Sequence, residues 1–468
     1  MSFASFISAI SKFLPSVEAP KAKPGLSGRL KYSFFVLVIF FILGNIALVG
    51  LTPAAVSGLG IYQIILASNI GTLLTVGIGP IVVASIILQL LVGTKIWKLD
   101  FGNPEERALF SSTQKILAII LSFFEALVYV QIGFLTPQAG MFFWVVLQVA
   151  LGSIVLLYLD EVVQKYGIGS GISLFIAGGV AAAVIWRVFN PVSTIGLGLK
   201  IVSGGAAFDF ATGAGLLWRF FAELGNSLYT ALVQHIFPIL FALIIFFIVI
   251  YFEGVYVNIP ITMGRSSQFG RYPVKFFYVS NLPVILSAAL FANIALIYAI
   301  VEKKAIPFLT TGLFYLSKYT TAPYDLTENL FLQGFAGLGG QILQAVIYLI
   351  LLSIVCVFFG VMWVKMAGQD SEAVSNQLQR SGMFLPGFRR DPRVIKSVLD
   401  RYIPTITIIG SIFVAVLAGF ASITNAVGTG MGILLTVDIV YRLYEEIVKE
   451  QVSTDSGLLT KLVSGMKH

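Results

Sequence analysis

Ten apolar stretches, each long enough to cross a lipid bilayer, dominate this sequence. A helix needs about 20 mostly apolar residues to span the hydrocarbon core of a membrane. Only 11% of the residues are charged, whereas soluble domains carry about 25%, so the bilayer must be the solvent for most of the chain. We therefore predict an all-α membrane protein with ten transmembrane helices. These helices are expected near residues 31–51, 70–93, 113–134, 141–160, 171–190, 229–252, 276–300, 341–366, 403–425 and 430–448.

The spans divide into two sets of five around the segment 191–228. An odd number of spans in each set inverts the second half relative to the first, an arrangement common in transport proteins. We expect a first five-helix half over 31–190, an external hinge connection over 191–228 and a second five-helix half over 229–450. The segments 1–30 and 451–468 are predicted to be a cytoplasmic amphipathic N-terminal segment and a cytoplasmic C-terminal tail.

The connection after the first span is unusual for a loop. Residues 52–68 are apolar and uncharged, yet they are too few to cross a bilayer as a helix. An apolar segment of this length is expected to re-enter the protein from the outer side. The sequence therefore predicts a short re-entrant helix between the first two spans.

Basic residues fix the orientation of the ten spans. With a cytoplasmic N terminus, all but six of the 30 Lys and Arg residues lie on the cytoplasmic side. The positive-inside rule therefore favours a multi-pass protein of the cell (plasma) membrane with both termini in the cytosol. The six outer basic residues are Arg187, Lys200, Arg219, Lys303, Lys304 and Lys318.

Three apolar stretches are rich in glycine, over residues 75–80, 166–171 and 428–432. Glycine lets membrane helices approach closely, and it lets the backbone bend where it lines protein or water instead of lipid. Almost no charge accompanies these stretches. The pattern is typical of a passage through the membrane and not of a catalytic pocket.

Ionisable groups are few within the predicted spans. Glu125 and Asp438 are the clear acids, and Arg442 follows Asp438 by one helical turn, which favours a structural ion pair. His235 is expected at a helix end near the interface, and Cys356, the single cysteine, lies in an apolar run. The sequence contains neither a nucleotide-binding loop motif nor a His-Glu-x-x-His motif. We therefore expect no enzyme activity, no cofactor and no metal.

Two basic loops stand apart from the remaining charges. Residues 265–275 and 368–400 place arginines at predicted turns, where a guanidinium can contact a phosphate or a carboxylate in a bidentate manner. An RNA-rich or acidic partner fits such loops. Plain topology signals and contacts with anionic lipid remain the alternative explanation for these charges.

Several long motifs, in order along nearly the whole chain, resemble the SecY family in its archaeal form. This family provides the pore subunit of the Sec protein-conducting channel. The resemblance implies ten helices in two inverted halves, hinged between the fifth and sixth helices, with a lateral opening between the second and the seventh. The motifs that carry it lie at residues 69–91, 158–171, 278–286, 387–390, 432–437 and 441–445.

The resemblance also assigns functional residues. The implied pore ring is Ile78, Val82, Ile172, Ile176, Ile285 and Leu435. The implied centre of the plug is Ser57, Gly58, Leu59, Gly60, Ile61 and Tyr62, and the implied lateral-gate residues are Glu125 and Asn293. The implied ribosome-binding residues are Arg265, Arg271, Arg389 and Arg390. Ordinary core packing is the alternative explanation for the ring, and a helix–helix hydrogen bond is the alternative for Asn293.

The family's implied partners are a SecE-like clamp subunit, a small beta-type subunit, the ribosome, signal peptides, nascent chains and membrane lipid. The expected function is a passive pore that passes unfolded secretory proteins outward and releases transmembrane segments sideways into lipid. An inverted-repeat secondary transporter for a small solute is the rival hypothesis. It requires a polar site at the membrane midplane, and Glu125 alone hardly provides one.

Overall fold

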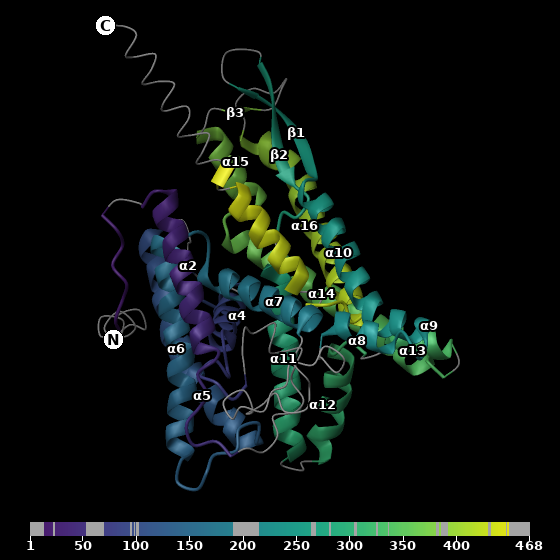
Figure 1. Ribbon diagram of the computed structural model, residues 1–468. Helices are drawn as coiled ribbons and strands as arrows, with labels where there is room; N and C mark the ends of the chain where they lie inside the picture. Colours follow the sequence, from purple (N-terminus) through teal and green to yellow (C-terminus); the bar gives the residue numbers. More distant parts are fainter. Residues whose placement is uncertain are drawn as a thin grey trace, which may run out of the picture.

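The computed structural model is a helical bundle with a small sheet at one end (Figure 1). Helices of the first half pack side by side on one flank, and those of the second half form the other flank (Figure 1). The residues that the structure describes are 14–21, 24–52, 70–93, 96–97, 99, 103–190, 215–263, 268–279, 282–303, 307–323, 326–335, 337–380, 383–384, 392–428, 432–445 and 447–448.

Five long helices build the first half. They are α2 (Leu26–Leu43), α4 (Gly79–Gly93), α5 (Pro104–Ile132), α6 (Phe142–Tyr166) and α7 (Gly171–Phe189). Local sequence sets the ends of α5, because the Asn103 side chain accepts a hydrogen bond from the Glu105 N–H at 3.0 Å and Gly133 ends the helix with φ 83°.

The described part of the second half also contains five apolar helical segments, one at each of the predicted spans. A continuous run of α9 (Leu228–Ala231), a π-helical turn (Leu232–Ile236) and α10 (Phe237–Glu253) forms the first. It is followed by α11 (Leu282–Lys303), α14 (Gly339–Met366), α16 (Pro392–Ile423) and a last helix over residues 432–445. Shorter helices connect them, namely α8 (Leu216–Glu223), α12 (Pro307–Thr320), α13 (Leu326–Gln333) and α15 (Ser371–Arg380).

A three-stranded antiparallel sheet with strand order β2-β1-β3 extends from the end of the bundle that also holds α15 (Figure 1). Strands β1 (Tyr256–Met263) and β2 (Gln268–Lys275) form a hairpin, and β3 (Met383–Phe384) pairs with the far end of β1. The connection between α5 and α6 lies at the opposite end of the bundle (Figure 1).

The prediction of an all-α membrane protein is confirmed. Among the described residues, eight helices are long and apolar enough to cross a membrane, and α4 and the helix over 432–445 lie at the two remaining predicted spans. The second span was predicted to begin near residue 70, whereas α4 begins at Gly79. Gly71 and Gly77 adopt φ values of 89° and 62°, so the backbone before α4 turns instead of continuing as a helix.

The buried core includes a cluster that joins the two halves. Side chains of α2, α4, α6 and α7 pack there against Leu286, Ala289 and Phe359 from α11 and α14. A second cluster lies within the second half, between α10, α11, α14 and α16. The boundary between the halves is therefore packed, and α4 and α11, the predicted sides of the lateral opening, are in contact.

Candidate functional site

The six predicted ring residues lie in one hydrophobic cluster at the boundary between the halves. Five of them are almost fully buried members of this cluster, and Ile172 is partly buried and packs against it. Val82 lies on α4, Ile172 and Ile176 on α7, Ile285 on α11 and Leu435 on the last helix. Residue 78, predicted within the second span, immediately precedes α4, and its carbonyl accepts the Val82 N–H at 3.1 Å.

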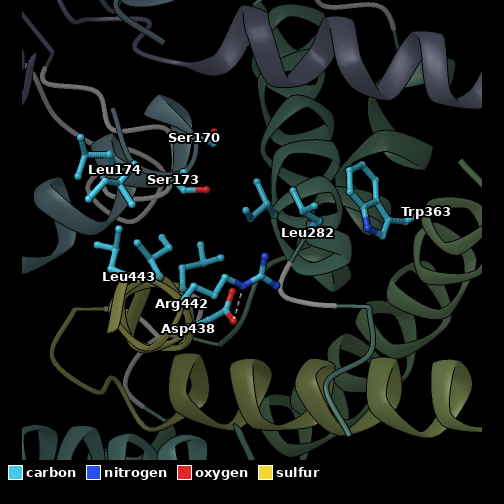
Figure 2. A pocket seen from close by; sticks show the side chains of 13 residues that line it. Ser170, Ser173, Leu174, Leu282, Trp363, Asp438, Arg442 and Leu443 are labelled. Atoms are coloured by element: carbon cyan, nitrogen blue, oxygen red, sulfur yellow. Dashed lines mark hydrogen bonds and ion pairs between the residues drawn. The ribbon is translucent and has the colours of Figure 1, made fainter. Parts of the chain in front are cut away.

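A cavity of about 330 Å³ opens next to this cluster (Figure 2). Ile285 and Leu435 belong both to the cluster and to the cavity lining, so the cavity leads directly to the ring. Ser173 on α7 and Trp363 on α14 face it from different sides (Figure 2). We call this space the vestibule.

One ion pair faces the vestibule. Arg442 Nε lies 3.0 Å from Asp438 Oδ1, one turn apart on the last helix (Figure 2). Asp438 is buried, whereas half of the Arg442 side chain is exposed. The structural ion pair predicted from the sequence is confirmed. It makes one side of the vestibule polar, whereas Ile285 and Leu435 of the ring make another side apolar.

The glycine-rich stretch 166–171 forms a tight turn between α6 and α7. Gly169 adopts φ 70°, and the turn is held from α2. Arg29 Nε donates to the Gly167 carbonyl at 3.1 Å, and the Ile168 N–H donates to Ser33 Oγ at 3.0 Å. The glycines predicted to bend the backbone therefore do so here, beside the vestibule.

A charged group that the sequence analysis did not identify joins the hairpin to the last helix. Lys275 Nζ lies 2.8 Å from Glu445 Oε1 and 3.8 Å from Glu253 Oε1. Partial burial, together with neighbouring Tyr441 and Glu445, raises the pKa of Tyr256 to about 12. The Tyr256 hydroxyl therefore stays protonated and donates to Glu445 Oε1 at 3.3 Å. Lys275 and Glu445 are 170 positions apart, so no local pattern could have paired them.

The remaining polar predictions have mixed outcomes. Glu125 is buried on α5, and its Oε1 has no hydrogen-bond partner among the described residues. Asn293 Nδ2 donates to the Ala289 carbonyl at 2.7 Å within α11, so this bond does not join two helices. The predicted position of His235 at a helix end near the interface is wrong, because His235 lies inside a continuous helical run and is buried, with its Nε2 2.8 Å from Glu223 Oε2. Within the described part of the chain, no group of three or more His, Cys, Asp or Glu side chains could hold a metal ion.

The implied plug, residues 57–62, lies outside the described residues. The described residues before and after the plug pair with each other, because Ala47 forms an isolated antiparallel β-bridge with Thr72. In the same region, the Thr52 N–H donates to the Thr136 carbonyl at 2.9 Å. The described residues on either side of this segment therefore lie at the same end of the first half.

The implied ribosome-binding residues are only partly described. Arg271 lies in β2, opposite Pro260, so its predicted position in a turn is wrong. Residues 268–275 form a strand of a hairpin, and a short basic stretch of sequence carries no clear strand signal. Arg265, Arg389 and Arg390 lie outside the described residues.

An apolar groove of about 620 Å³ lies on the other side of the last helix. Val437 and Val440 line it, whereas Leu435 and Asp438 face the vestibule, so this helix separates the two spaces. The other walls come from the first half through α7 and from the second half through α10. We call it the hinge groove; its lining includes Val184, Val188, Leu243, Phe246, Val437 and Val440.

Comparisons with known proteins agree with this geometry. The family model described as SecY matches residues 72–444. Protein translocase subunit SecY of Methanothermobacter thermautotrophicus is 41% identical over 453 residues, which cover 94% of each chain. The same subunit of Methanocaldococcus jannaschii is 40% identical over 463 residues, covering 96% of this chain and 98% of the relative.

Two solved structures are similar over almost the full length. A protein-conducting channel gives a TM-score of 0.78 at 38% identity, covering 95% of this chain and 97% of the other. Sec61 in the canine ribosome-channel complex from the endoplasmic reticulum gives a TM-score of 0.75 at 37% identity, with the same coverage.

Proposed function

The chain belongs to the SecY family and is the pore subunit of a protein-conducting channel, and on that premise we propose that its six ring residues close the pore at the boundary between the halves. The observation that carries this proposal is the convergence of six residues from distant segments into one apolar cluster beside the vestibule. The chain is a multi-pass membrane protein and a channel subunit, not an enzyme.

An apolar constriction suits the passage of unfolded chains. Branched apolar side chains dewet a narrow pore and so block ions. They offer no hydrogen bonds that would hold a passing backbone, so the ring can seal the pore at rest and yield to a substrate. The vestibule is proposed as the site where signal peptides and nascent chains first enter, and the segment 52–68 as the plug behind the ring.

Sideways release into lipid is proposed to occur between α4 and α11, near Glu125 and Asn293. An apolar residue at the centre of a membrane helix gains about 0.3–0.6 kcal/mol, whereas a charged residue costs about 2.5–3.5 kcal/mol. A segment of about 20 apolar residues therefore favours lipid even when it carries one charge. The rival transporter hypothesis requires a polar midplane site, whereas the cluster between the halves is apolar.

We expect a translocating chain to contact the ring. A photoreactive probe replacing Ile176 is expected to cross-link to an arrested secretory protein, because the chain must pass this constriction. A probe replacing Ile354 on the exposed face of α14 is the control and is expected to label lipid. Equal substrate labelling at both positions would show that the path lies elsewhere.

The proposed orientation places both termini, the hairpin and α15 on the cytoplasmic side of the cell membrane. This follows the positive-inside distribution, and it is supported by the joint position of the hairpin and α15 at one end (Figure 1). The five proposed segments are 1–30, 31–190, 191–228, 229–450 and 451–468.

The ribosome is proposed to dock on the two basic loops together. Met263 of β1 pairs with Met383 of β3. Arg265 follows the first by two residues, and Arg389 follows the second by six. The sheet therefore ties together the chain positions from which both loops extend. Sec61, a structural relative, is found in a ribosome-channel complex.

We expect the double substitution Arg389→Glu with Arg390→Glu to weaken ribosome binding. A hydrogen bond to a charged group is worth about 1.5–3 kcal/mol, so even one lost contact lowers affinity about tenfold or more. Binding should also weaken with salt. The control, Lys318→Glu with Arg219→Glu, makes the same charge change on the proposed outer side. A co-sedimentation assay at low salt in which the two double variants bind equally well would refute the docking site.

A SecE-like single-span subunit is proposed to occupy the hinge groove and to clamp the halves. The groove is apolar and bounded by both halves and the last helix, so a helix lying in it limits their separation. Family membership also implies a small beta-type subunit.

Filling the groove with Leu243→Trp and Val440→Trp is expected to remove most of the clamp subunit from the complex purified in mild detergent. Ile354→Trp, on a lipid-facing position, is the control, and full retention of the subunit by the groove variant would refute this site.

A further inference from the structure

Asp160 lies near the end of α6, and its side chain is buried. The Ile172 N–H donates to Asp160 Oδ1 at 3.0 Å, and Gln164 Nε2 donates to Oδ2 at 2.8 Å. One side chain of α6 therefore accepts a hydrogen bond from an N–H group in the first turn of the next helix.

This arrangement replaces a local cap. Ser170 occupies the N-cap position of α7, but its side chain makes no capping hydrogen bond. The first N–H groups of a helix need acceptors, and a carboxylate also interacts favourably with the positive end of the helix dipole. Here the acceptor comes from the neighbouring helix, so it fixes α7 to α6 as well as capping it.

The backbones of α6 and α7 touch at the same point. A Cβ added to Gly171 would lie 2.5 Å from Asp160 Cα and 2.9 Å from its Oδ1. Only glycine allows the first turn of α7 to approach so closely. The carboxylate and the glycine together define where α7 begins.

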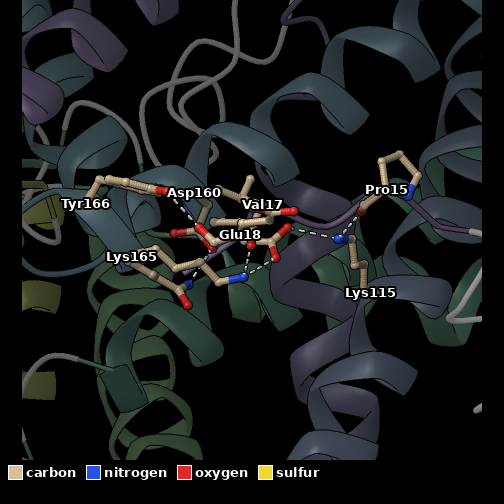
Figure 3. Close-up of polar contacts among 9 residues, drawn as sticks. Pro15, Val17, Glu18, Lys115, Asp160, Lys165 and Tyr166 are labelled. Atoms are coloured by element: carbon tan, nitrogen blue, oxygen red, sulfur yellow. Dashed lines mark hydrogen bonds and ion pairs between the residues drawn. The ribbon is translucent and has the colours of Figure 1, made fainter. Parts of the chain in front are cut away.

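The end of α6 is itself fastened on its other side (Figure 3). Glu161 pairs with Lys115 of α5 at 2.8 Å and with Lys165 at 2.9 Å. The same two lysines donate to the carbonyls of Pro15 and Val17 in the N-terminal segment. These contacts hold the helix end that carries Asp160, so the carboxylate has a fixed position from which to hold α7.

Ile172 and Ile176 lie in the first two turns of α7. We propose that Asp160 is a positioning residue that fixes the first turn of α7 and thereby places Ile172 and Ile176 in the ring. The consequence for the seal rests on the proposed function of the ring. The placement of the first turn of α7 by Asp160 does not depend on that proposed function.

Amide hydrogen exchange in the first turn of α7 tests the placement. Asp160→Ala is expected to exchange about fivefold faster there, the factor that corresponds to loss of a helix cap worth about 1 kcal/mol. Asp160→Asn keeps an acceptor at Oδ1 and is expected to restore slow exchange. Ser33→Ala is the control, because it removes the 3.0 Å bond to the Ile168 N–H in the same turn but outside α7.

Planar-bilayer conductance tests the consequence. Asp160→Ala is expected to leak ions, and both Asp160→Asn and Ser33→Ala are expected to stay sealed. Gly171→Ala, which pushes the first turn away with Asp160 still present, is expected to leak as well and serves if Asp160→Ala does not fold.

Unchanged exchange in Asp160→Ala would overturn the proposal. So would faster exchange without a leak, provided that direct substitution of the ring at Ile78, Ile176 and Leu435 does leak. If that ring variant stays sealed, the proposed function fails, and the exchange measurement alone decides whether Asp160 positions α7.

Discussion

Ion conductance through the resting channel is expected to rise sharply when Ile78, Ile176 and Leu435 are all replaced by serine. The three side chains come from different elements and are 0%, 0% and 2% exposed. Serine removes most of each side chain and adds a hydroxyl, so the constriction becomes wider and wet. Planar-bilayer recording of the reconstituted channel with its partners measures the change.

A matched control separates a seal from ordinary core. Val149, Ile245 and Leu352 are each 0% exposed and lie on α6, α10 and α14, away from the ring. Large-to-small changes in a core cost about 2–5 kcal/mol each, so serine at these three positions should weaken the fold as much as the ring variant. Only the ring variant should conduct.

Export of a normal secretory protein is expected to persist in the ring variant, because an apolar ring offers a passing chain no hydrogen bonds that the substitutions would remove. A transporter would behave in the opposite way, losing solute uptake without gaining a conductance. If the folded ring variant carries no more current than the control variant, these residues contribute only to core packing.

The sequence was sufficient for the spans because their signal is local. A run of about 20 apolar residues identifies a membrane helix without knowledge of its neighbours. The ring was accessible in part for the same reason, since Ile172 and Ile176 are four residues apart and share a face of α7. That the six residues meet required the resemblance, because they come from segments far apart in the chain.

Other features depend on partners that the sequence does not place. Asp160 lies within residues 158–171, one of the motifs that carry the resemblance, yet only the structure shows that its carboxylate accepts the Ile172 N–H at 3.0 Å. The sequence indicated only that Lys275 is one of several basic residues in a loop, and the structure shows its ion pair with Glu445. Helix α12 (Pro307–Thr320) was not predicted, because its 14 residues are too few for a span signal.

The last helix links the proposed activities. One face carries Leu435 of the ring and Asp438 of the vestibule, and the opposite face forms a wall of the hinge groove. Lys275 then ties the end of this helix to the hairpin through Glu445. A clamp subunit in the groove and a ribosome on the hairpin would therefore act on the same helix from two sides.

Gly152→Ala is expected to destabilise the first half strongly. A Cβ at Gly152 of α6 would lie 1.8 Å from the Leu73 carbonyl oxygen and 2.7 Å from its carbon. These are backbone atoms that cannot rotate away, so we expect a loss of about 3 kcal/mol or more, the upper range for overpacking. Thermal unfolding of the purified complex and the amount of folded chain in membranes measure it.

Alanine at position 312 is expected to change the stability in the opposite direction. Gly312 lies within α12, and no atom of the described residues lies within 4 Å of its added Cβ. Alanine is favoured over glycine in a helix by about 1 kcal/mol, so Gly312→Ala is expected to be neutral or stabilising. Equal stability of the two variants would contradict the close approach of α6 to residue 73. Because Leu73 begins the turns that lead to Ile78, any Gly152→Ala chain that still folds is also expected to leak ions.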